Sequence, residues 1–242
     1  MTALLAFDTA TEHMSIALRV RGELRVHEAA GGAQASATLI PAIMALLADA
    51  GVTLRELDAI AFGRGPGAFT GLRTACSVAQ GLAFGAGKPV LPIDTLLAVA
   101  EDARVGAAPQ RIWVAMDARM NEIYAAHYAF DAGHWTTLTA PLLTTPEALN
   151  ARWASEAPDA VAGSALSVFA SALRPGAARL ARDALPRASA MLALAQDAWE
   201  RGGAVDPALA LPLYVRDKVA QTTAEREALR LAAATSDPER AR

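Results

Sequence analysis

The chain has 242 residues, of which 53% are hydrophobic and 19% charged, with a formal net charge of −3. This length suits one large or two small globular domains with a real core. Aromatic residues make up 5% of the chain and no basic run occurs, which disfavours an autonomous nucleic-acid-binding protein. No stretch approaches the ~20 uninterrupted apolar residues of a membrane span. The single cysteine, Cys76, excludes an intrachain disulfide, so we expect a cytoplasmic protein.

The first half of the chain alternates predicted strands with predicted helices. Hydrophobic periodicity, broken at glycines and polar turns, predicts strands over 3–9, 15–20 and 24–27, a helix over 36–50, a strand over 57–62, a helix over 72–84, a strand over 90–93 and a helix over 95–104. Thr53 and Glu56 have the spacing of a capping box. Strands that alternate with helices predict an α/β layered fold.

A glycine-rich run, Gly63–Arg73 (GRGPGAFTGLR), is the most informative segment. It lies between a hydrophobic strand and an alanine-rich helix, where such loops often bind phosphate. A Walker A loop needs Lys and Ser or Thr after its last glycine, whereas Leu72 and Arg73 follow Gly71 here. The dinucleotide fingerprint also fails, because Gly71 stands one place too late. A sharp strand-to-helix turn with close packing is the alternative.

The second half repeats the beginning of the first. Residues 112–119 form a second apolar strand with an aspartate, Asp117, followed by a returning strand over 123–130, as Asp8 is followed by the strand over 15–20. This repeat predicts two related halves, with an N-terminal lobe over 1–105, a C-terminal lobe over 106–220 and a polar tail over 221–242. Further predictions are helices over 145–153 and 189–201 and a strand over 160–163.

The two repeated aspartates suggest the plan of an actin-like ATPase, in which such loops hold phosphate and a metal. Neither Asp8 nor Asp117 is followed by the glycine that lets backbone N–H groups approach a phosphate, and Arg119 would fill the second loop. The alternative is that both aspartates cap turns. The four histidines lack metal-ligand spacing, and we expect Ser164 to be a helix N-cap.

The two helices of the N-terminal lobe carry apolar faces. In the second, Ala75, Ala79 and Ala83 form a ridge of small residues that would let another helix approach closely. On pattern alone this ridge fits either a partner protein or the interior of the domain.

Four segments of the chain resemble the bacterial TsaB family, also called YeaZ. They are Leu5–Glu12 (LAFDTATE), Asp58–Arg73 (DAIAFGRGPGAFTGLR), Met116–Tyr124 (MDARMNEIY) and Leu211–Arg216 (LPLYVR). The resemblance implies a two-lobed actin-like (ASKHA) fold, each lobe a mixed sheet flanked by helices. Its family motif corresponds here to Asp8, Thr9, Gly63, Arg64, Gly65, Gly67, Gly71, Arg73, Asp117 and Arg119.

The resemblance also implies a function through partners. TsaB binds the catalytic paralogue TsaD, which TsaE joins, and together they transfer threonylcarbamoyl to the tRNA adenosine next to the anticodon. TsaD holds a metal through a histidine pair, but the matching stretch here, Gln34–Pro41, contains no histidine. The chain is therefore expected to be non-catalytic and to hold no metal or cofactor of its own, while its partners bind the metal and ATP. Whether a nucleotide binds at the junction between the subunits is an open question at this point.

In that family the first two helices of the N-terminal lobe contact TsaD, and the same surface allows a homodimer. The resemblance implies that the partner-binding residues here are Leu39, Ile43, Leu46, Leu72, Ala75, Cys76, Ala79 and Leu82. It also implies that the chain contacts tRNA only as part of the complex. A free-standing actin-like ATPase or kinase is the competing hypothesis. A zinc-dependent glycoprotease is a third.

Overall fold

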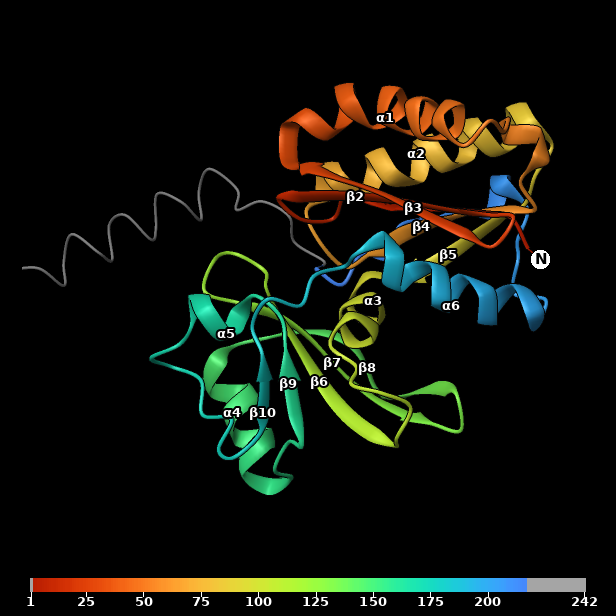
Figure 1. The fold of residues 1–242 in the computed structure, drawn as a ribbon. Helices are drawn as coiled ribbons and strands as arrows, with labels where there is room; N and C mark the ends of the chain where they lie inside the picture. Colours follow the sequence, from red (N-terminus) through yellow and green to blue (C-terminus); the bar gives the residue numbers. More distant parts are fainter. Residues whose placement is uncertain (1, 217–242) are drawn as a thin grey trace, which may run out of the picture.

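Two five-stranded sheets form the framework of the computed structural model, which describes residues 2–216 (Figure 1). The first sheet has the order β3-β2-β1-β4-β5. Its strands are β1 (Leu4–Asp8), β2 (His13–Val20), β3 (Glu23–Ala30), β4 (Ala59–Gly65) and β5 (Val90–Asp94). The second has the order β10-β9-β6-β7-β8. Its strands are β6 (Gln110–Asp117), β7 (Ile123–Asp131), β8 (His134–Thr144), β9 (Ala160–Ala162) and β10 (Arg179–Ala181).

The two sheets have the same topology. β1 pairs antiparallel with β2 and parallel with β4, and β6 pairs antiparallel with β7 and parallel with β9. The outer strands repeat the pattern, since β2–β3 and β7–β8 are antiparallel and β4–β5 and β9–β10 are parallel. The repeat seen in the sequence is thus a structural duplication, and the fold is the expected two-lobed, actin-like α/β fold.

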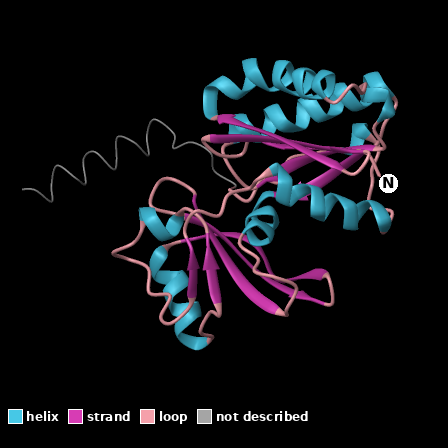
Figure 2. Ribbon diagram, viewed as in Figure 1, coloured by secondary structure: helices cyan, strands magenta, loops and turns pink. Residues whose placement is uncertain are grey.

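Helices cover both sheets (Figure 2). Helices α1 (Ala35–Asp49) and α2 (Phe69–Ala86) lie together on one face of the first sheet, and α6 (Ala188–Glu200) lies on the opposite face. Helix α3 (Thr95–Asp102) lies between the lobes, while α4 (Pro146–Ser155) and α5 (Ala165–Val168) cover the second sheet. Short 3-10 turns are η1 (Gly32–Gln34), η2 (Leu54–Glu56) and η3 (Pro207–Leu209). The capping box of Thr53 and Glu56 is present at η2.

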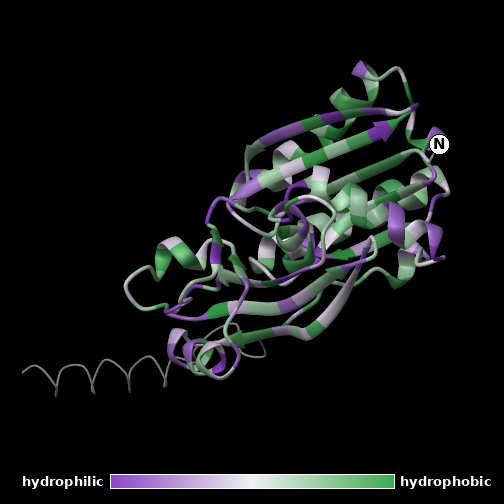
Figure 3. Cartoon of the chain, turned by 60° about the horizontal axis from the view of Figure 1, so that its bottom comes forward, coloured by the Kyte–Doolittle hydropathy of each residue, from purple (hydrophilic) through white to green (hydrophobic). Residues whose placement is uncertain are grey.

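The cores explain why these segments are helices. In α1, Leu39, Ile43, Leu46 and Leu47 recur at helical spacing and are buried against the first sheet. Hydrophobic residues run along the strands and the helix faces packed on them (Figure 3). On the far side of α3, Leu96, Val99 and Ala100 join the core of the second sheet. Because residues of α3 are buried in the cores of both sheets, this helix joins the two lobes.

The division of the chain into lobes at 1–105 and 106–220 is wrong in its second part. Helix α6 packs on the first sheet, where Met191, Leu192 and Ala195 share a core with Leu4 and Ala6. Beyond it, Val205 forms an antiparallel bridge with Val90 of β5. Residues 188–210 thus belong with the N-terminal lobe, a return that chain order alone does not reveal. The expected tail over 221–242 lies outside the described residues.

Candidate functional site

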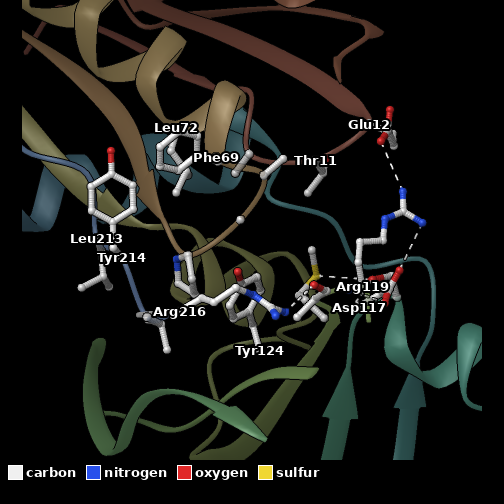
Figure 4. A pocket seen from close by; sticks show the side chains of 18 of the residues that line it. Thr11, Glu12, Phe69, Leu72, Asp117, Arg119, Tyr124, Leu213, Tyr214 and Arg216 are labelled. Atoms are coloured by element: carbon white, nitrogen blue, oxygen red, sulfur yellow. Dashed lines mark hydrogen bonds and ion pairs between the residues drawn. The ribbon is translucent and has the colours of Figure 1, made fainter. Parts of the chain in front are cut away.

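A cavity of about 580 Å³ lies between the lobes. Four segments supply most of its lining: the β1–β2 loop, the loop from β4 into α2, the β6–β7 turn and residues 213–216 of the C-terminal segment Ala210–Arg216, which we call the strap. Ser164, Val168 and Leu185 complete the lining. Figure 4 shows their side chains converging, with Phe69 and Tyr214 on one side and Arg119 and Asp117 on the other. Each segment carries one of the four family-like motifs, so motifs far apart in sequence meet at one place.

The glycine loop is a sharp, closely packed turn from β4 into α2. A Cβ atom at Gly63 would lie 1.7 Å from an Asp8 carboxylate oxygen, and one at Gly71 would lie 1.9 Å from the Thr9 carbonyl oxygen. The Thr9 hydroxyl donates to the Gly71 carbonyl at 2.7 Å, and the Ala68 N–H donates to the Ala10 carbonyl at 2.8 Å. The glycines let two backbones meet, so β1 and the start of α2 pack closely against each other here.

Asp8 is fully buried and holds this junction together. Its carboxylate accepts hydrogen bonds from the Ala10 N–H at 2.7 Å and the Thr95 hydroxyl at 2.9 Å. Thr95 in turn accepts from the Gly65 N–H at 3.1 Å, so β1, the glycine loop and α3 share one network. Burial raises the pKa of Asp8 to about 6, although the hydrogen bonds from Ala10 and Thr95 favour the charged form.

The β6–β7 turn has an unusual backbone. Arg119, Met120 and Asn121 have φ values of 61°, 55° and 60°, three successive left-handed residues without a glycine. The Asp117 carboxylate accepts from the Arg119 N–H at 2.9 Å, as expected of an aspartate that caps a turn. The Arg119 side chain then crosses the cavity to Glu12 at 3.3 Å (Figure 4). Asp117 therefore positions a cation that spans the lobes.

The strap was not recognised as part of a site from the sequence. The Leu213 N–H donates to the Arg64 carbonyl at 2.7 Å, which fixes the strap to the N-terminal lobe. Arg216 pairs with Glu122 at 2.6 Å and donates to the Ala118 carbonyl at 2.9 Å, which fixes it to the left-handed turn. The available signal was the motif Leu211–Arg216 itself, an apolar run that ends in tyrosine and arginine.

The family-motif residues divide by location. Gly67, Asp117 and Arg119 line the cavity. Arg64 instead pairs with Asp94 at 2.5 Å beside a second cavity of about 310 Å³. The others lie beneath the cavity or on the helix surface, namely Asp8, Thr9, Gly63, Gly65, Gly71 and Arg73. Ser164 stands at the N-cap of α5, but its hydroxyl makes no capping bond and accepts from the Asp117 N–H instead.

The residues expected to bind a partner lie on α1 and α2, but on the buried faces of these helices. Seven of them are buried inside the N-terminal lobe and the eighth is half-buried, namely Leu39, Ile43, Leu46, Leu72, Ala75, Cys76, Ala79 and Leu82. The alanine ridge packs in the lobe's own core, with Ala75, Ala79 and Ala83 fully buried. Small residues allow close approach, but here the close neighbours belong to the same chain.

The opposite faces of α1 and α2 form an exposed surface with few charges, which we call the outer face. Its large apolar residues are Ile40, Met44 and Phe84, which are 45%, 47% and 61% exposed. Ser77, Gly81 and Gly85 are exposed at four-residue spacing, and a Cβ added at either glycine would meet open space. The charged residues of the two helices are Asp49 in α1 and Arg73 in α2.

Comparison with known proteins identifies the family. A family model described as TsaD, tRNA N6-adenosine threonylcarbamoyltransferase, matches residues 23–223. A relative from Haemophilus influenzae, a tRNA threonylcarbamoyladenosine biosynthesis protein TsaB, is 37% identical over 89% of this chain and 94% of its own length. The chain belongs to the TsaB family. The Escherichia coli TsaB is 33% identical over 90% of this chain and 96% of its own length.

Solved structures of the TsaB family agree. YeaZ from Pseudomonas aeruginosa has a TM-score of 0.80 at 37% identity, covering 88% of this chain and all of that chain. Within residues 2–216, no group of three or more His, Cys, Asp or Glu side chains could hold a metal ion. By length and composition the segment Gly32–Asp49 could cross a membrane, but in this TsaB-family chain its apolar residues fill the core or the outer face.

Proposed function

We propose that this chain is the cytoplasmic, non-catalytic subunit that binds a TsaD-type threonylcarbamoyltransferase. With a TsaE-type ATPase as third component, the complex transfers threonylcarbamoyl to the tRNA adenosine next to the anticodon. The chain meets tRNA through this complex, and metal and ATP chemistry belong to the partners. Membership of the TsaB family supports the pathway, and the outer face of α1 and α2 supports the partner role.

The outer face has the features of a helix-packing interface. Interface cores are depleted in charge, and α1 and α2 together carry one acidic and one basic side chain. Ser77, Gly81 and Gly85 are exposed small residues at four-residue spacing in α2, and Ile40, Met44 and Phe84 are exposed apolar residues of the same two helices. A partner helix could therefore approach α2 closely and bury apolar side chains on both sides. A second copy of the chain could use the same face before the partner displaces it.

The contacts beneath the cavity support a non-catalytic role. At the N-terminus of α2, the Ala68 N–H, which could donate to a phosphate, is instead bonded to the Ala10 carbonyl. Asp8, the residue an actin-like ATPase would need, is bonded to Thr95 and shut away from solvent. The cavity itself stays available for a nucleotide held jointly with the partner at the subunit junction.

The decisive test substitutes the outer face without touching the core. Gly81→Gln places a long side chain where the monomer has open space, so the fold should remain intact while a close partner helix is blocked. Ala151→Gln, at an exposed position of α4, is the matched control. Light scattering after gel filtration with TsaD from the same organism should show a heteromer for the wild type and the control, and at least tenfold weaker association for Gly81→Gln.

Two results would contradict the proposal. Equal association of Gly81→Gln and wild type would exclude the outer face as the interface. Absence of any heteromer at micromolar concentration, with nucleotide hydrolysis by the isolated chain, would favour the free-standing ATPase instead.

A further inference from the structure

A cluster of three side chains joins the strap to the first turns of α2. The guanidinium carbon of Arg73 lies 3.8 Å from the centroid of the Phe69 ring. The Arg73 Nε donates a hydrogen bond to the Tyr214 hydroxyl at 3.1 Å. The Phe69 and Tyr214 rings lie 5.6 Å apart, tilted by 37°. Contacts on two sides thus fix the orientation of a cation on the protein surface. We call Phe69, Arg73 and Tyr214 the arginine cluster.

In the part of the chain that the structure describes, hydrogen bonding within the cluster uses only the Nε of Arg73. Within residues 2–216, Arg73 forms no ion pair, and its two terminal nitrogens donate no hydrogen bond, since only its Nε does. Those two nitrogens form the fork that binds a carboxylate through two parallel bonds. The Tyr214 hydroxyl accepts from Arg73 and still has its own hydrogen to donate. The two terminal nitrogens of Arg73 and the Tyr214 hydroxyl are therefore available to donate to a bound anion.

The surroundings of the cluster are apolar and exposed. Phe69 is 37% exposed and Tyr214 47%, and Leu211, three residues earlier in the strap, is 69% exposed. The strap is held along α2 because the Ala210 carbonyl accepts from Cys76 and from Gln80. An oriented arginine beside an exposed tyrosine has the composition of a protein-binding hot spot, which is enriched in both residue types.

We propose that the arginine cluster binds a carboxylate of the partner protein and that the strap is part of the partner-binding surface. The inference rests on the proposed function and specifies the chemistry of its interface: an apolar partner surface that presents an aspartate or glutamate at the N-terminal end of α2. A protein carboxylate fits better than RNA phosphate, because phosphate backbones are bound by several cations in a row. Arg73 is the one cation of α2.

The test measures binding of TsaD from the same organism by titration calorimetry at two salt concentrations. Arg73→Ala should raise Kd at least tenfold and weaken its salt dependence. Tyr214→Phe keeps the ring but frees Nε and loses one donor, and should raise Kd two- to fivefold. The matched control is Arg111→Ala, which removes the same charge from an exposed site in the C-terminal lobe and should stay within twofold of wild type.

The outcomes separate this inference from the proposed function. If wild type binds TsaD and Arg73→Ala binds equally well, the arginine cluster is not an anchor, while the proposed function stands. If Arg73→Ala binds TsaD normally but the assembled complex loses tRNA affinity, the anion is an RNA phosphate and the inference is overturned. If wild type does not bind TsaD, both fail together.

Discussion

At the scale of single residues, the buried carboxyl of Asp8 makes stability depend on pH. Its pKa is about 6 in the folded chain and ~3.9 in an unfolded chain. Between these pH values the folded state binds more protons, so the free energy of unfolding falls as pH rises from about 4 to about 6, by about 2–3 kcal/mol. Low pH therefore favours this part of the fold.

The measurement is urea unfolding of wild type and Asp8→Asn at pH 4, 5, 6 and 7. Asparagine cannot titrate, so its loss of stability relative to wild type should be largest at pH 4 and should shrink towards pH 7. A difference that stays constant across this range would show that Asp8 keeps an ordinary pKa.

Two glycines of one helix provide a second, internally controlled test. Gly71 and Gly81 both lie in α2, so alanine gains the same helix propensity at each, about 1 kcal/mol. At Gly81 the new methyl group meets open space, whereas at Gly71 it meets the Thr9 carbonyl oxygen at 1.9 Å. Gly81→Ala should raise the free energy of unfolding by about 0.5–1 kcal/mol, and Gly71→Ala should lower it by about 2–4 kcal/mol. Equal effects in thermal melts would contradict the close packing at Gly71.

At the scale of elements, the turn between β6 and β7 contains three residues in the left-handed conformation, which is unfavourable for residues other than glycine. Left-handed residues other than glycine cost about 1–2 kcal/mol each, and Arg216 and Glu122 hold the turn in place. Met120 is 58% exposed with φ of 55°, so Met120→Gly relieves strain and loses little burial. Chemical denaturation should show a gain of about 0.5–1 kcal/mol. Ala151→Gly, in the middle of α4, should lose about as much; a loss at Met120 as well would contradict the strain.

Sequence patterns predicted the elements far better than the faces they bury. Alternating apolar residues and the glycine run defined β4, the tight loop and α2 to within a few residues. The sequence does not predict strand β8, because Thr136, Thr137, Thr139 and Pro141 interrupt the alternation of apolar and polar residues, and the apolar Leu138 is exposed at this edge of the sheet. On pattern alone the alanine ridge of α2 fits a partner or the interior, and the family resemblance assigns it to a partner. A helix pattern shows which residues share a face, but packing decides what that face meets, and here it meets the core of the same lobe.

At the scale of the whole molecule, the site depended on contacts that no local pattern contains. The motif segments were visible in the sequence, but the convergence of Glu12, Arg119 and Arg216 on one cavity follows from the duplication and from the return of the chain after the second lobe. Tyr214 and Arg73 are 141 residues apart in the chain and form a hydrogen bond. Such distant pairs are set by tertiary structure.

The return of α6 makes a prediction about which part of the chain can fold. A fragment of residues 1–105 contains the whole first sheet but lacks α6, so the sheet face formed by Leu4, Ala6 and Ala17 would lose Met191, Leu192 and Ala195. Large apolar surface left in water opposes folding, and β5 would also lose its bridge to Val205. The fragment should therefore show no cooperative thermal transition by circular dichroism.

Joining residues 187–216 to that fragment through a flexible Gly/Ser linker should restore a cooperative transition, because it restores α6, the bridge and the strap. The matched control carries the same joined segment with Met191→Asp and Leu192→Asp, which keeps length and linker but cannot bury α6. A cooperative transition in the bare 1–105 fragment would mean that α6 adds little to the lobe. Failure of the joined fragment would instead mean that the lobe depends on α3 being buried against the second sheet.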